Sequence, residues 1–418
     1  MNPGMDRRAF LGWALGGSLS LSLRPLAGLG SLGSLSGGDS NFLVILNLAG
    51  GNDGLNSFPP LHLPLYRERR PRVHLGPEEC LAPKLGTKPA PRRFHPSLAQ
   101  LARRFEAGQM AILQKVGYPK PNLSHFVSED IWSLGLRHAP KGKKKGWIAR
   151  LMDAHLPDPR MVLGIGTGQK LDFQGGRQVP FLVSSKTEIG VPTDTLHPLV
   201  SRYIFEHQKA DLQRLRLPPG ALSEVAKVQK LAFASVEETR KQLARYVSNV
   251  VYPKSRLGQD LRLAARFLCT GFPTRLVYTQ LGGFDHHRDQ GRHQGRQADL
   301  LRDVDQSLHA FLRDLEAHGL LDRALVLVVS EFGRRNYDNG SLGTDHGEGN
   351  DLWVLGKSVR PGFLGPDLET KDLQGENLPY ALDFRRVYAQ ALQRHLHLDP
   401  KPVFPEEPEA ALDLPFLR

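Results

Sequence analysis

Cysteine is scarce in this sequence, and a long uninterrupted apolar segment is missing from it. The only two cysteines are Cys80 and Cys269, too few for a disulfide framework or a cysteine-based zinc finger. One disulfide between them in an oxidising compartment stays open, because spacing alone does not show pairing. The apolar stretch near the N-terminus, residues 9–23, is rich in glycine and serine and too short to span a bilayer stably. We therefore expect no stable membrane span in the processed protein.

Negative charge is also in deficit. The chain has 55 Lys and Arg against 43 Asp and Glu, which gives a net charge of +12. The basic residues are nevertheless dispersed. The one dense run, residues 141–145, is short and contains a glycine, as is typical of a solvated loop. The sequence has neither zinc-finger spacing nor an aromatic-rich RNA-binding motif. These observations argue against nucleic acid as a partner. The positive net charge would suit an anionic substrate instead.

The N-terminus has the pattern of a targeting signal. A short basic start contains Arg7 and Arg8, followed by Phe10, Leu11 and a mildly apolar stretch. This pattern resembles a twin-arginine export signal, so residues 1–40 are predicted to be a signal with a Gly/Ser/Leu spacer. The export machinery of that route would then be a partner, and the protein would be periplasmic or extracellular. Because this route carries folded proteins, a metal could be loaded before export.

The remaining chain alternates between apolar strands and amphipathic helices. Hydrophobic residues make up 40% of the chain and charged residues 23%, as in a soluble globular protein. Residues 297–319 have a leucine stripe of helical spacing, and the segments around them are almost wholly apolar. The apolar strands are expected at 42–48, 110–116, 275–280, 324–329 and 351–356. We therefore predict a single α/β domain over 41–418 with a mostly parallel central sheet, helices on both faces and a Pro-rich tail.

Polar side chains that suit metal binding or catalysis come after these strands. Ligands of open α/β sheets bind beyond the carboxyl ends of the strands, so residues there should meet at one edge. The "GGNDG" stretch after the first strand is a strong turn by itself, since Asn and Asp beside Gly favour turns. The turn and ligand interpretations of its aspartate are compatible. The candidates at this edge are Asp53, Ser124, Asp285, His286, His287, Glu331, Arg334, Asp345 and His346.

These side chains suit one or two divalent ions. Mixed oxygen and nitrogen donors favour zinc or manganese over calcium. Ser124 opens a predicted helix, where it could act as a metal-activated nucleophile. Arg334 is a candidate for bidentate binding of an anionic substrate, with a solvated charge at a strand end as the alternative.

Several motifs occur together in a specific order: "GGNDGLN", "FHPSL", "VGYPKPNLSHFVSEDIW", "GWIAR", "GGFDHHRDQ", "SEFGRR", "NGSLGTDHGEGN" and "DFRRVYA". Over about residues 40–400 the chain resembles the exported bacterial family called domain of unknown function 1501. That family is similar to the alkaline phosphatase and sulfatase superfamily, which implies the α/β fold of those enzymes.

The resemblance also implies roles for single residues. Asp53 matches the first aspartate of the superfamily, and Ser124 stands where its nucleophile does. Asp285 and His287 match an Asp-x-His pair, with His286 as an additional imidazole. Glu331 falls where the superfamily has an aspartate ligand, and His346 is the ligand implied late in the chain, with Asp345 as a further candidate. The departure from the pattern is Phe332, which replaces the usual histidine ligand.

These residues lead to two hypotheses about function. The first is an exported metal-dependent hydrolase of phosphate or sulfate esters, acting on a small anionic molecule or a surface polymer through Ser124. The alternative is an exported, non-catalytic binding or assembly protein of the same fold that contains a metal. Phe332 favours the alternative, because the loss of a histidine weakens or removes one metal position.

Overall fold

A computed structural model describes residues 40–138, 144–185, 234–406 and 415–418, with single positions between 203 and 230. Residues 1–39 of the predicted export signal lie outside the described residues. The Ala-, Glu- and Gln-rich stretch 220–250 predicts a further helix or helix pair, of which 220–229 and 231–233 also lie outside the described residues, whereas 234–243 are helical. The chain divides into two compact units, residues 1–34 with 186–242 and residues 35–185 with 243–418. All predicted site residues belong to the second unit. One domain over 41–418 stays a prediction for the segment 186–242.

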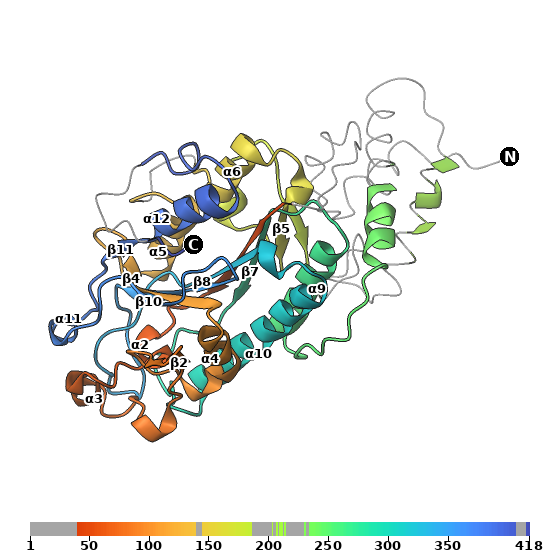
Figure 1. The fold of residues 1–418 in the computed structure, drawn as a ribbon. Coiled ribbons are helices and arrows are strands. Elements are labelled where there is room, and N and C mark those ends of the chain that lie inside the picture. Colours follow the sequence, from red (N-terminus) through yellow and green to blue (C-terminus); the bar gives the residue numbers. More distant parts are fainter. Residues whose placement is uncertain are drawn as a thin grey trace. The chain divides into compact units, whose positions relative to one another are not determined.

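A nine-stranded sheet forms the centre of the second unit (Figure 1). Its strand order is β10-β4-β9-β8-β1-β7-β5-β6, and β11 also pairs with β4. The strands are β1 (Phe42–Leu48), β4 (Met110–Gly117), β5 (Val162–Ile165), β6 (Phe181–Val183), β7 (Leu276–Leu281), β8 (Ala324–Val329), β9 (Asn350–Leu355), β10 (Gly362–Leu364) and β11 (Leu382–Asp383). The strands predicted from the sequence are therefore present, and the fold class is confirmed as α/β with a mostly parallel sheet.

Strand β1 lies in the middle and is parallel to both neighbours, β7 and β8. Strand β9 alone runs opposite to the others, since it is antiparallel to β8 and to β4. The connection from β8 to β9, residues 330–349, contains no helix, so the chain turns back instead of crossing over. That long return carries Glu331, Arg334, Asp345 and His346 along the carboxyl edge of the sheet.

Helices cover the two faces of the sheet in separate groups (Figure 1). The first group is α9 (Arg256–Cys269) with α10 (Arg296–Ala317), and the second is α5 (His125–Leu134), α6 (Trp147–His155) and α12 (Phe384–Gln390). Leu43 and Ile45 of β1 face the second group, in one apolar cluster with Trp147 and Phe384. All seven residues of β1 are buried, because a strand covered on both sides has no polar face.

Smaller elements complete the unit. They include α2 (Gly54–Ser57), α3 (Pro64–Arg69), α4 (Ala99–Glu106), α11 (Thr370–Gln374) and the short hairpin β2 (Lys84–Leu85) and β3 (Lys88–Pro89). Cys80 and Cys269 are both free thiols, and burial raises the pKa of each to about 12. Neither is therefore a ready nucleophile near neutral pH.

We predict that His95 makes folding sensitive to acid. Its buried ring accepts a hydrogen bond from Ser97 N at Nδ1 and donates from Nε2 to the carbonyl of Arg292. Burial lowers the pKa of His95 to about 4. The unfolded chain protonates the ring near pH 6.5, so stability should fall between about pH 6.5 and 4, by up to about 1.4 kcal/mol per pH unit.

The measurement is urea unfolding of the wild type and of His95→Asn across this pH window. Asparagine keeps an acceptor for the Ser97 N–H but does not titrate, so the difference between the two slopes isolates the imidazole. Equal slopes in both proteins would show that His95 carries none of the acid sensitivity.

Candidate metal centre

Three imidazoles surround one carboxylate oxygen at the carboxyl edge of the sheet. Asp285 Oδ1 lies 3.1 Å from Nε2 of His287 and 3.1 Å from Nε2 of His346. His125 Nε2 is 3.3 Å from the same oxygen. The Nε2 atoms of His287 and His346 are only 2.8 Å apart. Ligand atoms of His125, Asp285 and His346 all lie within 4.8 Å of one another. We call these four residues the histidine cluster.

The other ring nitrogen of each histidine fixes its tautomer. His125 Nδ1 donates to Glu331 Oε1 at 2.8 Å, and His287 Nδ1 donates to Asp345 Oδ1 at 2.8 Å. His346 Nδ1 donates to the carbonyl of Leu123 at 2.6 Å. Ionised carboxylates and carbonyls only accept hydrogen bonds, so in each neutral ring the proton sits on Nδ1. All three Nε2 atoms therefore present a lone pair.

The convergence of these lone pairs calls for a cation. Three acceptor nitrogens and an acceptor oxygen repel one another at these distances, and a single added proton would relieve one pair only. His125 Nε2 is buried and has no hydrogen-bond partner among the described residues. A divalent ion accepts all four donors at once, and a carboxylate or carbonyl behind each imidazole is the usual outer shell of a metal-bound histidine. The donor set thus fits the metal that the sequence predicted.

Charge around the cluster keeps its carboxylates ionised. Burial raises the pKa of Asp285, but the hydrogen bond and charge of Arg334, together with His346 and His287, outweigh that effect and hold the pKa well below its usual range. Burial also raises the pKa of Glu331, but the hydrogen bonds from His125 and from the Gly50 N–H lower it, and the net shift is downward. The hydrogen bond between His125 and Glu331 is also the main reason why the pKa of His125 is raised. Each carboxylate can therefore anchor an imidazole.

The loops that carry the cluster depend on close backbone contact. Gly50 adopts φ +113°, and its N–H donates to Glu331 Oε1 at 2.8 Å. A Cβ at Gly50 would stand 2.6 Å from the backbone nitrogen of Asp285. The glycine after β1 is therefore required both for its conformation and for space.

Arg334 has a different role from the predicted one. Its side chain is 1% exposed and donates to the carbonyls of Gly50, Gly51, Phe284 and Thr344 as well as to Asp285 Oδ1. These acceptors occupy the guanidinium, so it has no free edge for a substrate anion. Arg334 instead joins three loops and holds Asp285 in place.

The structure does not bring Asp53 to the histidine cluster. Arg70 Nη1 binds both carboxylate oxygens of Asp53, at 2.9 and 2.7 Å, and Gln290 Nε2 binds Oδ2 at 2.7 Å. Asp53 also caps α2 by accepting from Asn56 N. The side chains of Arg70 and Asp53 are 0% and 1% exposed. Asp53 is thus a buried ion-pair partner, and we leave it out of the proposed ligand set.

The remaining candidates lie in or beside the cluster. Glu331 and Asp345 accept hydrogen bonds from the Nδ1 atoms of His125 and His287, on the side of each ring that faces away from Asp285. Ser124 is the residue before α5, between Leu123 and His125, and its side chain does not cap the helix. His286 is buried, and this burial lowers its pKa to about 4.

His125 is a candidate ligand that the sequence analysis did not include. Its signal was its position in "NLSHF", at the start of a helix that comes after an apolar strand, next to the serine that was singled out.

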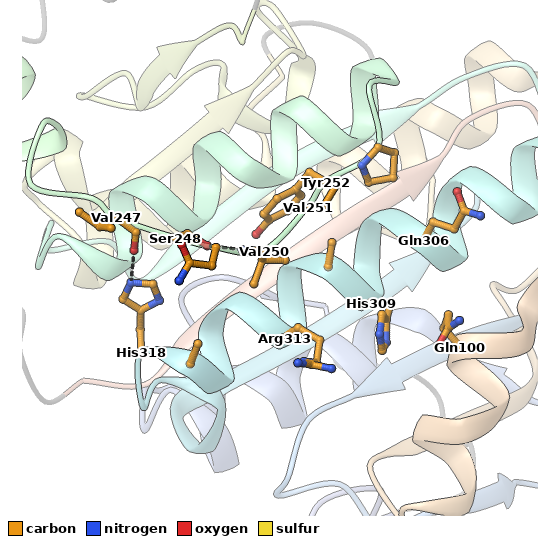
Figure 2. A pocket seen from close by; sticks show the side chains of 14 residues that line it. Gln100, Val247, Ser248, Val250, Val251, Tyr252, Gln306, His309, Arg313 and His318 are labelled. Carbon is orange, nitrogen blue, oxygen red and sulfur yellow. Dashed lines mark hydrogen bonds between the residues drawn. The ribbon is translucent and has the colours of Figure 1, made fainter.

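A separate cavity of about 780 Å³ runs along α10 (Figure 2). His309 and Arg313 of the helix line it, and the extended segment 247–253 forms its other wall. Asp314 ties that wall to the helix, since its carboxylate accepts from the hydroxyls of Tyr246, Ser248 and Tyr252. No residue of the histidine cluster lines this cavity.

The fold and the site together define the class of the protein. It is an α/β protein with a candidate metal site at the carboxyl edge of its sheet. The chain belongs to the family described as protein of unknown function (DUF1501), whose model matches residues 112–399. No curated protein sequence is detectably similar to the chain. Among the described residues, no helix has both the length and the apolar character needed to cross a membrane.

Several solved structures are similar to this one at low identity. The PsFucS1 sulfatase from Pseudoalteromonas sp. has a TM-score of 0.37 and 12% identity, with 85% of this chain and 68% of that chain covered. The periplasmic domain of EcEptC from Escherichia coli, in complex with zinc, has a TM-score of 0.40 and 9% identity over 87% and 84%. A protein in the alkaline phosphatase superfamily from Vibrio parahaemolyticus has a TM-score of 0.36 and 10% identity over 88% and 69%.

We predict that Asp53→Asn weakens folding and leaves metal binding intact. The substitution leaves the buried Arg70 charge without its counterion, which typically costs about 3–5 kcal/mol. Urea unfolding and metal analysis of the same preparation measure the two effects. Asp299→Asn is the matched control, because Asp299 pairs with Arg302 at the surface and is 68% exposed. Loss of metal at unchanged stability would instead make Asp53 a ligand.

Proposed function

We propose that this protein is a metal-dependent hydrolase of phosphate or sulfate esters. The observation that carries the proposal is the convergence of three imidazole lone pairs on Asp285, beside the N-terminus of α5. Four donors of this kind hold a divalent ion firmly, and the open, partly exposed side of the cluster is where a substrate can approach. His287 and Asp285 are each 45% exposed at their side chains.

Within the described residues, the ion would be held by His125, Asp285, His287 and His346. Three nitrogens and one oxygen suit zinc best, with manganese as the next choice. A bound divalent ion would supply Lewis acidity towards an oxygen of the ester. Glu331, Asp345 and the Leu123 carbonyl hold the rings in the required tautomer, so the chain itself sets the geometry before any substrate arrives.

Ser124 is the proposed nucleophile. Its neighbours on both sides contact the cluster, Leu123 through its carbonyl and His125 through its ring. It occupies the N-terminal end of α5, where backbone N–H groups and the helix dipole favour an anionic group. The hydroxyl is not used as a helix cap, which leaves it available for chemistry.

Export belongs to this proposal too. The twin-arginine pattern at Arg7 and Arg8 and the apolar stretch after it support export to the periplasm or the cell exterior. The net charge of +12 favours an anionic ester, either a small molecule or part of a surface polymer.

One observation favours the non-catalytic alternative as a second function. The ring of Phe332 packs against His125 and His346, with centroid distances of 4.7 and 4.8 Å. An apolar ring therefore stands where a further ligand would extend the site. This arrangement supports one ion instead of two. A metal-containing binding protein would use it equally well.

We predict that His346→Ala removes the bound metal. Purified wild-type protein should contain about one divalent ion per chain, and the variant should contain little, because one of four ligands and its contact with Leu123 are gone. Elemental analysis after purification without chelator measures this. His155→Ala is the matched control, since His155 is half-buried, lies outside the cluster and hydrogen-bonds the Asp399 carbonyl through its ring. Metal-free wild-type protein would refute the site.

We predict that Ser124→Ala abolishes ester hydrolysis while keeping the metal. Turnover of aryl phosphate and aryl sulfate should fall by at least about a thousandfold, as for other catalytic serines. Ser358→Ala, which removes a hydroxyl without a hydrogen-bond partner in the described chain, should change nothing. Persistent turnover in Ser124→Ala would reject Ser124 as the nucleophile. A metal-loaded wild type without turnover would favour the binding protein.

A further inference from the structure

Two exposed apolar side chains belong to segments that carry the histidine cluster. Among the described residues, the large hydrophobic side chains that remain exposed are Phe126, Tyr203, Val247, Val251 and Leu342. Phe126 is 85% exposed and directly follows the cluster residue His125. Leu342 is 49% exposed and lies in the loop between Arg334 and His346. Each of these side chains would gain free energy if an apolar group covered it.

The side chain of Phe126 does not pack into the apolar core. The core side of α5 is formed by Ile131, Trp132 and Leu134, which are all buried. Trp132 stacks on Phe384 at 4.1 Å between centroids, whereas Phe126 occupies the first turn of the helix, in solvent. That turn is also where His125 enters the cluster. The residue is therefore placed beside the site by the same helix that supplies a ligand.

Leu342 is held in an unfavourable backbone conformation. Its φ is +59°, a region that residues with a branched side chain rarely adopt. Hydrogen bonds fix the loop there: Gln290 N donates to the Leu342 carbonyl at 2.9 Å, and Asp289 N donates to the Ser341 carbonyl at 3.0 Å. The loop is thus clamped to the segment just after His287. Strained residues of this kind gather at ligand sites.

We propose that the substrate is an amphiphilic ester, with its anionic group at the histidine cluster and a hydrocarbon chain packed on Phe126 and Leu342. This inference rests on the proposed function and names the substrate class of that same site. One molecule with an anionic head and an apolar tail satisfies the cation site and both exposed side chains together. A lipid-like phosphate or sulfate ester has this chemistry.

A protein partner or a second copy of the chain fits the observations less well. Specific protein interfaces bury about 800 Å² on each side, whereas two side chains supply at most a few hundred. Val247 and Val251, the other exposed apolar pair in this unit, border the cavity along α10 and no cluster residue. They offer a matched control, because Val251 is 89% exposed.

The test is binding to the metal-loaded protein, measured by calorimetry below the micelle concentration of each probe. Decylphosphonate and ethylphosphonate share a non-hydrolysable anionic head and differ only in their chain. Decylsulfonate and ethylsulfonate, run in parallel, distinguish a phosphate-like from a sulfate-like head. We expect the decyl probe of the preferred head to bind at least about tenfold more tightly than its ethyl partner, from the apolar area that it buries.

The double variant Phe126→Ser with Leu342→Ser should lose most of this ratio while its affinity for the ethyl probe and its metal content stay unchanged. Val251→Ser should keep the wild-type ratio. Equal affinity for both chain lengths in the wild type, or an equal loss of the ratio in Val251→Ser, would overturn the inference. A shift of the double variant to a smaller oligomer on a sizing column would also overturn it, in favour of a protein contact.

The two proposals fail in distinguishable ways. Metal-loaded protein that hydrolyses aryl esters but ignores chain length refutes the amphiphilic substrate alone. Protein that prefers the decyl probe and hydrolyses no ester keeps the amphiphilic ligand and refutes the hydrolase. Absence of binding of every probe to metal-loaded protein refutes the amphiphilic substrate, whatever the outcome for hydrolysis.

Discussion

The guanidinium of Arg334 is the interaction on which the arrangement of the site depends. A cation that is almost fully buried is tolerated only when its hydrogen-bonding capacity is met. Here the partners are the carbonyls of Gly50, Gly51, Phe284 and Thr344, together with Asp285. These groups come from the loops after β1, β7 and β8. Satisfying one buried charge therefore fixes three loops relative to one another, and the histidines that they carry are fixed with them.

A second level of order lies behind the imidazoles. Glu331, Asp345 and the Leu123 carbonyl each take the Nδ1 proton of one histidine. Glu331 is itself held by the Gly50 N–H and by the Ser330 hydroxyl. Carboxylates so placed do not need to touch a metal to matter, because they decide which nitrogen carries the lone pair. In this geometry Glu331 and Asp345 serve to orient the imidazoles and not to bind the ion directly.

The sequence predicted the fold, and the edge of the sheet at which the site lies, more reliably than it predicted the roles of single residues at that edge. Continuous apolar strands separated by an amphipathic helix define a covered parallel sheet, and this pattern is local. The direction of β9 depends on the 330–349 return, which has no local signature. Asp285, His287 and His346 came together as expected because each lies directly beyond the sheet edge.

Asp53, Arg334 and His125 show what sequence patterns leave undecided. An aspartate and an arginine at a sheet edge have the same pattern whether they face a ligand or a neighbouring charge. Asp53 is occupied chiefly by Arg70, which lies 17 positions further along the chain and binds both of its oxygens. At the start of α5 a hydroxyl and an imidazole stand side by side, and the pattern "NLSHF" does not show which of the two points to the cluster. The partner of a polar residue, more than its position, determines its role.

Three of the five non-glycine residues with positive φ in the described chain lie in loops that lead to or from the histidine cluster. They are Lys120, Asp289 and Leu342, whereas Lys115 and His397 lie elsewhere. The first three lie in the loops that precede Ser124, follow His287 and precede Asp345. Each such conformation costs free energy that neighbouring hydrogen bonds must offset, and a protein under selection for stability alone would replace these residues by glycine or asparagine. Their presence in the loops that carry four convergent ligand atoms indicates that the positions of the loop side chains are used. Leu342 is the clearest case, because an exposed apolar residue contributes little to stability.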